Sequence, residues 1–288
     1  MKKSILSLAL VLAVLASMTV FAVREEPATT EPAMTTINEY EMLQQLAAKP
    51  AEQLTEEGFS DSEIIEIQNY KENYSEHISA LQELDDAVLE AHGYSSEQID
   101  VIRNFSGTEE EMLRASATVN LYSTTSMFRT ESDGSGGVYS KGRLVFGWDW
   151  HGIPEFKWTD IVAFSWNTWK LEGSSCSVGY FDVLSGFAYK TQDATLYKAS
   201  SLGLDGAGFK FPMALDNNKY YAKNGSGYFD LKSDVHSLKD FYCYGEYGHN
   251  QVFINSPTFS VGTGGADLSI TFSAGTVCAD STSVQYEW

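Results

Sequence analysis

The sequence predicts an α+β multidomain protein in which a short helical-repeat bundle precedes an antiparallel β-sandwich of jelly-roll-like type. Residues 36–126 place apolar side chains at helical spacing and repeat one motif at an interval of 35 residues. Residues 138–288 consist of short alternating runs separated by glycine and asparagine turns. Between them, the polar and glycine-rich stretch 127–137 is expected to be a linker.

A secretory signal peptide is predicted at residues 1–22. Lys2 and Lys3 precede an almost wholly apolar run that ends near Val20, and the small residue Ala22 closes the segment. A retained membrane anchor is the alternative, because the apolar run is about long enough to cross a bilayer. The cleavage pattern favours removal, so we expect a secreted, extracellular chain that begins at Val23 and has no membrane span.

The mature chain is strongly acidic toward its start. Residues 23–35 are polar and rich in Pro, Thr and Glu, and are expected to form a disordered tether. Residues 23–126 carry 22 acidic and five basic side chains, and the whole chain has a net charge of −20. Such a charge argues against nucleic acid and anionic lipid as partners. We interpret it as a solvated surface, with binding of cations or basic peptides as the alternative.

One motif occurs twice in the helical segment: GFSDSEIIEIQNY from Gly58 and GYSSEQIDVIRNF from Gly93. In each copy a leucine four residues earlier closes a helix on the glycine, which is expected to adopt a left-handed conformation. A serine and a Glu or Gln three residues after it then form a capping box for the next helix. These residues are Leu54, Gly58, Ser60 and Glu63 in the first copy, and Leu89, Gly93, Ser95 and Gln98 in the second.

The same capping pattern predicts further helix starts at Thr36, with Glu39, and at Thr108, with Glu111. The repeat covers about two and a half units, which is fewer than an extended binding solenoid needs. We therefore interpret it as a duplication that builds a stable bundle, and we expect residues 36–126 to fold as a separate unit.

The second half contains three cysteines and about nine short runs of strand character. We expect a disulfide between Cys243 and Cys278, because strands that are close in sequence are often neighbours in a sheet. Cys176 would then remain a thiol. The alternative is that all three cysteines are small buried apolar side chains.

No catalytic, nucleotide-binding or zinc-binding motif occurs in the chain, and the five histidines are scattered. We therefore expect no cofactor and no metal site. A paired-carboxylate hydrolase of the glycosidase type remains an alternative, because it needs only two acids at a suitable separation. Asp149, Glu155 and Asp160 are the candidate acids.

A cluster of tryptophans is the strongest functional signal. Five of them fall within 22 residues, and an exposed indole can stack on a sugar or a peptide side chain. The candidate binding residues are Trp148, Trp150, Trp158, Trp166 and Trp169. In a strand Trp148 and Trp150 share one face, and large aromatics commonly fill a core, so a core role is the alternative and is favoured.

These observations predict a secreted, non-enzymatic binding or interaction protein of the bacterial exterior. Its β domain is expected to contact an extracellular glycan or protein partner. The alternatives are the carboxylate-dependent hydrolase and a structural, self-associating component of the cell envelope.

Overall fold

A computed structural model describes the chain between residues 33 and 287, with gaps. The described ranges are 33–56, 59–132, 134–135, 137–155, 157–166, 169–198, 206–233, 240–249, 258–261, 268–271, 277–278 and 282–287. After His249 only the backbone of the strands is described.

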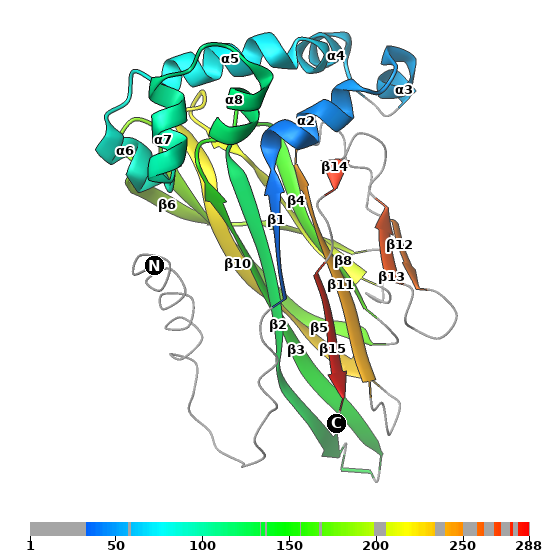
Figure 1. The fold of residues 1–288 in the computed structure, drawn as a ribbon. Helices are drawn as coiled ribbons and strands as arrows, with labels where there is room; N and C mark the ends of the chain where they lie inside the picture. Colours follow the sequence, from blue (N-terminus) through cyan, green and yellow to red (C-terminus); the bar gives the residue numbers. More distant parts are fainter. Residues whose placement is uncertain are drawn as a thin grey trace.

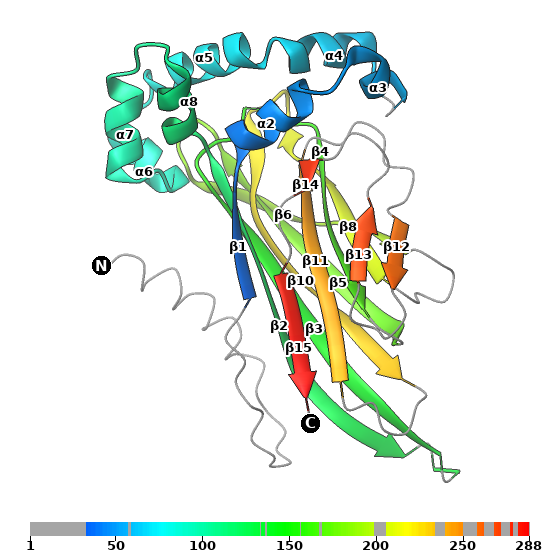
Figure 2. The same ribbon diagram turned by 45° about the vertical axis from the view of Figure 1, so that its right-hand side comes forward.

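Helices occupy the first part of the described chain and cover one end of the β-sheets (Figure 1). Figure 2 shows the same arrangement from a second direction. The helices are α2 (Glu39–Ala47), α3 (Ala51–Glu56), α4 (Asp61–Gln68), α5 (Tyr70–Leu81), α6 (Asp86–His92), α7 (Ser96–Arg103) and α8 (Glu109–Ala115).

The β part consists of two large antiparallel sheets and a small two-stranded one among the described residues. The first sheet has the order β1-β2-β3-β10-β5-β6, with β9 also paired to β10. Its strands are β1 (Ala33–Asn38), β2 (Thr118–Ser132), β3 (Val138–His151), β5 (Lys170–Asp182), β6 (Ala188–Asp193), β9 (Ala214–Leu215) and β10 (Tyr220–Ser233).

The second sheet has the order β14-β11-β4-β8-β7, with β15 also paired to β11, and β12 pairs with β13 separately. These strands are β4 (Thr159–Trp166), β7 (Thr195–Lys198), β8 (Gly206–Pro212), β11 (Asp240–His249), β12 (Thr258–Val261), β13 (Leu268–Thr271), β14 (Val277–Cys278) and β15 (Thr282–Glu287). The helical part followed by two antiparallel sheets agrees with the predicted order. The jelly-roll topology is not confirmed, because hairpins of consecutive strands, β2–β3 and β5–β6, lie within one sheet.

Aromatic rings from both large sheets fill the space between them. Phe146 of β3 contacts Phe164 of β4 at a centroid distance of 4.9 Å. Trp148 stacks on Phe211 of β8 at 4.6 Å with an interplanar angle of 13°. Alternate residues of β3 therefore face the second sheet, as the period of two in a strand requires.

The boundary between the helical and β parts differs from the prediction. Residues 118–132 form a strand that pairs with β3, whereas the sequence suggested a helix end followed by a linker at 127–137. Val119 and Leu121 are buried while their neighbours are partly exposed, which is the burial pattern of a strand. The β-branched and aromatic residues of this segment suit a strand better than a helix.

The N-terminal boundary also differs. Residues 33–35 were expected in the tether and residues 36–38 at the start of a helix. Ala33–Asn38 instead forms an edge strand that pairs with β2. The hydrogen bonds to β2 stabilise a strand that the local sequence does not predict. Thr36 does not cap a helix, and its hydroxyl donates to Asn120 Oδ1 at 2.6 Å. The cap of α2 is Asn38, whose side chain accepts from the Glu41 N–H at 3.2 Å.

The repeated turn is confirmed where the structure describes it. Complete capping boxes start α4 at Ser60, α7 at Ser95 and α8 at Thr108. Gly93 is left-handed with φ +93°, and the Tyr94 N–H donates to the Leu89 carbonyl at 3.1 Å. The equivalent bond from Phe59 to Leu54 measures 3.0 Å, while Gly58 itself lies outside the described residues.

The helical layer shares its core with the sheets. Buried apolar side chains from the helices and from both large sheets form one continuous cluster. Polar contacts join the same parts, since the Gly152 N–H donates to the His92 carbonyl at 3.0 Å and the Glu39 N–H donates to the Ala117 carbonyl at 3.0 Å. This arrangement differs from the expected separate bundle, because one face of the helices is buried by the sheets.

We predict that Gly93→Val destabilises the protein more than Ser95→Ala does. An added Cβ at Gly93 would lie 3.3 Å from His151 Nδ1, in a left-handed backbone that costs an L-residue about 1–2 kcal/mol. Loss of the serine cap costs about 1 kcal/mol. Urea denaturation of both variants measures the two free energies of unfolding.

Gly107→Val is the matched control, because Gly107 has φ +95° and a Cβ there would have no neighbour within 4 Å. Gly107→Val should show the cost of a left-handed backbone without a steric contact such as the one that Gly93→Val makes with His151. Equal stability of Gly93→Val and the wild-type protein would contradict the assignment of this turn.

Candidate functional site

A buried ionic network lies where the helical layer meets the second sheet. His249 on β11 contacts Asp160 on β4 through Nδ1, at 2.9 Å from Oδ2, and contacts Glu39 on α2 through Nε2, at 3.3 Å from Oε1. All three side chains are buried. Both ring nitrogens face carboxylate oxygens, which suits a ring that donates from both, so we interpret His249 as an imidazolium.

Neighbouring hydroxyl groups extend this network on both sides. Tyr247 donates to Asp160 at 2.6 Å and accepts from Trp150 Nε1 at 3.1 Å. Tyr74 donates to Glu39 at 3.2 Å. Burial alone would lower the pKa of His249, but the attraction of Asp160 and Glu39 outweighs it and raises the pKa to about 9. The network is closed to solvent, so we interpret it as structural.

The three candidate acids of the hydrolase hypothesis have separate basic partners. Asp160 belongs to the buried network. Glu155 pairs with His77, with Oε2 2.9 Å from Nδ1. Asp149 lies 3.7 Å from Lys223 Nζ and 3.4 Å from His151 Nε2. None of the three lines the pocket described below, and the structure adds no support for a carboxylate pair that faces a substrate.

The tryptophans of the predicted binding cluster lie mostly in the core. Trp148, Trp150, Trp166 and Trp169 have no exposed surface, and Trp158 is partly buried and packs against the core. A binding platform needs an exposed ring face, which the four buried indoles do not have. These four indoles are part of the buried core, as the alternative interpretation expected.

The predicted disulfide does not fit the register of β11. Cys243 lies opposite Val284 of β15 and Trp166 of β4, whereas Cys278 of β14 lies opposite Gly248. Five residues along a strand correspond to about 17 Å, and bridged cysteines have Cα atoms about 4.4–6.8 Å apart. Cys176 is a buried thiol on β5, and burial raises its pKa.

An exposed apolar surface lies at the tip of the β5–β6 hairpin, near α6 (Figure 1). Leu184 is 69% exposed, Phe187 is 74% exposed and Tyr189 is 47% exposed. These are three of the six large apolar side chains that are strongly exposed among the described residues. We call this surface the hairpin tip, consisting of Leu184, Phe187 and Tyr189; the adjacent Tyr220 is buried, at 8% exposure.

The turn that carries the hairpin tip is held in a fixed conformation. The Asp182 carboxylate accepts from the N–H groups of Leu184 and Ser185, each at 3.0 Å. Gly186 has φ +72°, and an added Cβ would lie 2.6 Å from Ala91 Cβ of α6, so the turn packs directly on this helix. The exposed side chains are thus displayed on a rigid support.

His92 of α6 supports the same hairpin from beneath. Its Nε2 lies 2.9 Å from the Val183 carbonyl, and its Nδ1 lies 2.9 Å from the Tyr221 hydroxyl. Burial lowers the pKa of His92 to about 4, although the bond to the Val183 carbonyl partly opposes this shift. His92 is therefore neutral at physiological pH and acts as a spacer between helix and hairpin.

Two lysines flank the aromatic part of the hairpin tip. Tyr189 and Tyr220 stack with a centroid distance of 3.7 Å and an interplanar angle of 5°. Lys190 Nζ lies 5.2 Å from the Tyr189 ring, and Lys219 Nζ lies 5.0 Å from the Tyr220 ring. Neither ammonium forms an ion pair with any carboxylate of the described residues. The Tyr220 hydroxyl raises the pKa of Lys219, and the Asp182 carboxylate of the same turn raises it further. Two lysines thus lie around one carboxylate at the hairpin tip.

One sequence pattern could have predicted the hairpin tip, but the interpretation concentrated on the tryptophan cluster. Leu184 and Phe187 belong to the segment DVLSGF, where apolar residues surround the serine and glycine of a turn. Turn residues are commonly polar or glycine. Apolar residues at such a place have no core to face and predict an exposed apolar surface.

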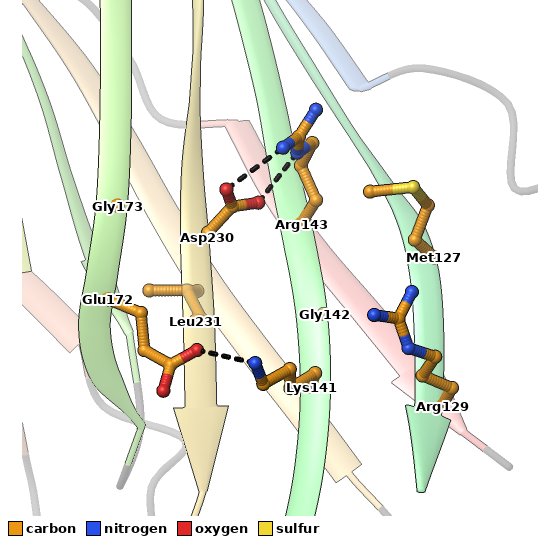
Figure 3. Close-up of a pocket in the computed structure, with 9 residues that line it drawn as sticks. All are labelled: Met127, Arg129, Lys141, Gly142, Arg143, Glu172, Gly173, Asp230 and Leu231. Atoms are coloured by element: carbon orange, nitrogen blue, oxygen red, sulfur yellow. Dashed lines mark hydrogen bonds and ion pairs between the residues drawn. The ribbon is translucent and has the colours of Figure 1, made fainter. Parts of the chain in front are cut away.

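A shallow pocket of about 220 Å³ opens on the outer face of the first sheet, at the end away from the helices (Figure 3). It is lined by Met127, Arg129, Lys141, Gly142, Arg143, Glu172, Gly173, Asp230 and Leu231. Among the described residues no group of three or more His, Cys, Asp or Glu side chains could hold a metal ion. No helix in the described part of the chain is long and apolar enough to cross a membrane.

The comparisons with known proteins give only remote similarities. No family model matches the chain, and no curated protein matches its sequence. A collagen-binding domain from a Staphylococcus aureus adhesin is 9% identical, with a TM-score of 0.30 over 58% of this chain and 97% of that domain. A pore-forming protein is 9% identical, with a TM-score of 0.24 over 59% of this chain and 90% of that chain.

A third solved structure concerns the pH-induced modulation of Streptococcus parasanguinis adhesion by Fap1 fimbriae. It is 8% identical, with a TM-score of 0.22 over 57% of this chain and 94% of that chain. TM-scores of this size do not establish a common fold. The functional argument therefore depends on the geometry of this chain alone.

We predict that His249→Ala lowers the free energy of unfolding by about 3–5 kcal/mol, since it leaves two buried carboxylates without their shared cation. His151→Ala is the matched control, because this histidine side chain is 35% exposed and, among the described residues, forms its ion pair with Asp149. It should change stability by about 0–1 kcal/mol. Urea denaturation at pH 7 measures both, and equal effects would contradict the structural role of the network.

The contribution of His249 should depend on pH. Its folded pKa of about 9 lies above the ordinary value of 6.5, so its stabilisation is complete below pH 6.5 and disappears as the pH rises through 9. A shift of this size corresponds to about 3 kcal/mol. The stability difference between wild type and His249→Asn should shrink accordingly between pH 6 and pH 9.5, as measured by urea denaturation. A constant difference would show that His249 is uncharged.

Proposed function

We propose that this protein is an extracellular, non-enzymatic binding protein whose β part docks onto a protein partner through the hairpin tip. The observation that carries the proposal is the rigid display of Leu184 and Phe187, at 69% and 74% exposure, on one turn. A soluble protein gains nothing for its own stability from apolar side chains in this position. Exposed apolar clusters typically mark sites of interaction.

The conformation of the hairpin tip favours a docking role. Side chains that are already fixed in the free protein lose little conformational entropy on binding. Leu184 and Phe187 can serve as anchors that fill a pocket on the partner. Tyr189, 47% exposed and stacked on the buried Tyr220, adds aromatic area of the kind found in binding hot spots.

The charges around the hairpin tip indicate the chemistry of the partner. Lys190 and Lys219 lie beside the stacked rings and outnumber Asp182, the carboxylate of the same turn, on a chain with a net charge of −20. A second copy of this chain is opposed by overall repulsion. The surface instead suits a partner that offers an apolar pocket edged by Asp or Glu side chains.

We predict that the double variant Leu184→Ser/Phe187→Ser loses at least tenfold in affinity for such a partner. The probe is a set of 12-residue peptides selected from a random display library on the wild-type protein, with Kd measured by biolayer interferometry. Peptides that bind the hairpin tip should combine apolar residues with Asp or Glu. Burial of two apolar side chains contributes about 1.5–3 kcal/mol each, which accounts for the expected loss.

Ile65→Ser and Met34→Ser are the matched controls, because these side chains are 57% and 66% exposed elsewhere on the molecule. They should leave peptide affinity unchanged. The double variant should melt at the wild-type temperature, since its side chains are not in the core. Selected peptides that bind the double variant as tightly as the wild type, or that are predominantly basic, would contradict the proposal.

A further inference from the structure

We infer that the outer face of the first sheet holds a second binding site, which takes a neutral saccharide unit in the pocket around Arg143 and Asp230. This site is independent of the hairpin tip. Asp182, which holds the tip, and Gly173, which lines the pocket, are nine residues apart along β5, a distance of roughly 30 Å. Gly173 lies near the start of β5 and Asp182 at its end, so the two surfaces lie toward opposite ends of this strand.

The pocket presents hydrogen-bond donors and acceptors side by side. Arg143 and Asp230 are directly opposite each other on β3 and β10, and Arg143 Nε and Nη2 donate to the carboxylate at 2.6 and 2.9 Å. The Arg143 guanidinium also lies 3.9 Å from the centre of the Tyr228 ring, which fixes its plane. Lys141 and Glu172 repeat the arrangement at 3.0 Å.

Each pair retains unused hydrogen-bonding capacity. A guanidinium has five N–H groups, of which Asp230 takes two, and a carboxylate has about four lone-pair positions. A hydroxyl group both donates and accepts, so two adjacent hydroxyl groups of a sugar match an Arg–Asp pair that offers both functions. Met127, which is 53% exposed, supplies an apolar contact for the C–H groups of the ring.

The charge balance of the pocket favours a neutral ligand over an anion. Arg143 pairs with Asp230, Lys141 pairs with Glu172, and Arg129 pairs with Glu131. An anionic ligand would have to displace one of these carboxylates, whereas hydroxyl groups can bind beside them. The volume is below the roughly 300–1,000 Å³ of pockets for drug-sized ligands, so the site suits a single sugar ring.

The backbone around the pocket keeps this space open. Met127 has φ +56° at a bulge in β2, where the register to β3 shifts between Ser126 and Arg129, and bulges commonly redirect side chains beside binding sites. A Cβ at Gly173 would meet only Asp230, at 3.4 Å from Oδ2. Gly173 adjoins a bulge in β5, where the register to β10 shifts between Asp230 and Leu231, and its missing side chain leaves the Asp230 carboxylate accessible.

Gly173→Val tests the site by filling it without changing a charge. The probes are the methyl glycosides of glucose, galactose, mannose and N-acetylglucosamine, measured by saturation-transfer NMR and calorimetry, with glucuronate and sulfate as anionic probes. We expect at least one neutral glycoside to bind with a Kd of about 1 mM. Gly173→Val should weaken that binding about tenfold or more because it blocks access to the Asp230 carboxylate. Asp230→Asn should weaken it by a similar factor because it removes the charge of that carboxylate.

Ser175→Val is the matched control, because Ser175 is exposed two residues further along β5 and does not line the pocket. It should leave the affinity within about twofold, a change too small to reflect a lost hydrogen bond. Thermal melts confirm that each variant is folded. The inference is overturned if no neutral glycoside binds, if binding persists in folded Gly173→Val, or if only glucuronate and sulfate bind.

Discussion

The fold depends on one buried cation, His249, held between Asp160 and Glu39. Glu39 and His249 are separated by 210 positions in the chain, so this contact fixes the start of the helical layer against β11 of the second sheet. Removing charges from water is unfavourable unless every charge is paired, and here both ring nitrogens and both carboxylates have partners. The hydroxyl groups of Tyr247 and Tyr74 complete the network, and the surrounding aromatic core excludes solvent. This arrangement holds the helices and the sheets in one relative position.

The hairpin tip is rigid because the helical layer, which is anchored to the sheets through His249, supports it. His92 and Ala91 of α6 support the β5–β6 turn only because the helical layer is anchored to the sheets. A helix thus contributes to a binding surface that consists entirely of β residues. His92 is neutral because burial would remove a charged ring from water, and this cost outweighs the favourable contacts with the Val183 carbonyl and with Asp182. The two histidines respond to pH in opposite ways. Protonation of His92 destabilises the fold as the pH falls from 6.5 toward 4, and loss of the proton from His249 destabilises it as the pH rises toward 9.

The two proposed binding surfaces use different chemistry on one sheet. The hairpin tip combines exposed apolar groups with two flanking lysines, Lys190 and Lys219, which suits an acidic protein surface. The pocket combines charged groups that are already paired, which suits neutral hydroxyl groups. Their separation along β5 would allow a saccharide and a protein to bind together, as a protein that connects two components of a cell surface requires. Each surface is tested by its own variants, so the failure of one leaves the other intact.

The sequence by itself determined the features that depend on neighbours in the chain. The capping boxes at Ser60, Ser95 and Thr108, the left-handed Gly93 and the change from helical to alternating pattern are local, because their hydrogen bonds span only a few residues. Only the tertiary structure decided which face of a strand is buried, and it placed four of the five clustered tryptophans in the core. It also decided that residues 118–132 pair as a strand, that Cys278 lies opposite Gly248, and that Arg143 meets Asp230. Register and burial depend on contacts between residues far apart in the chain, and no local pattern encodes which distant segment supplies them.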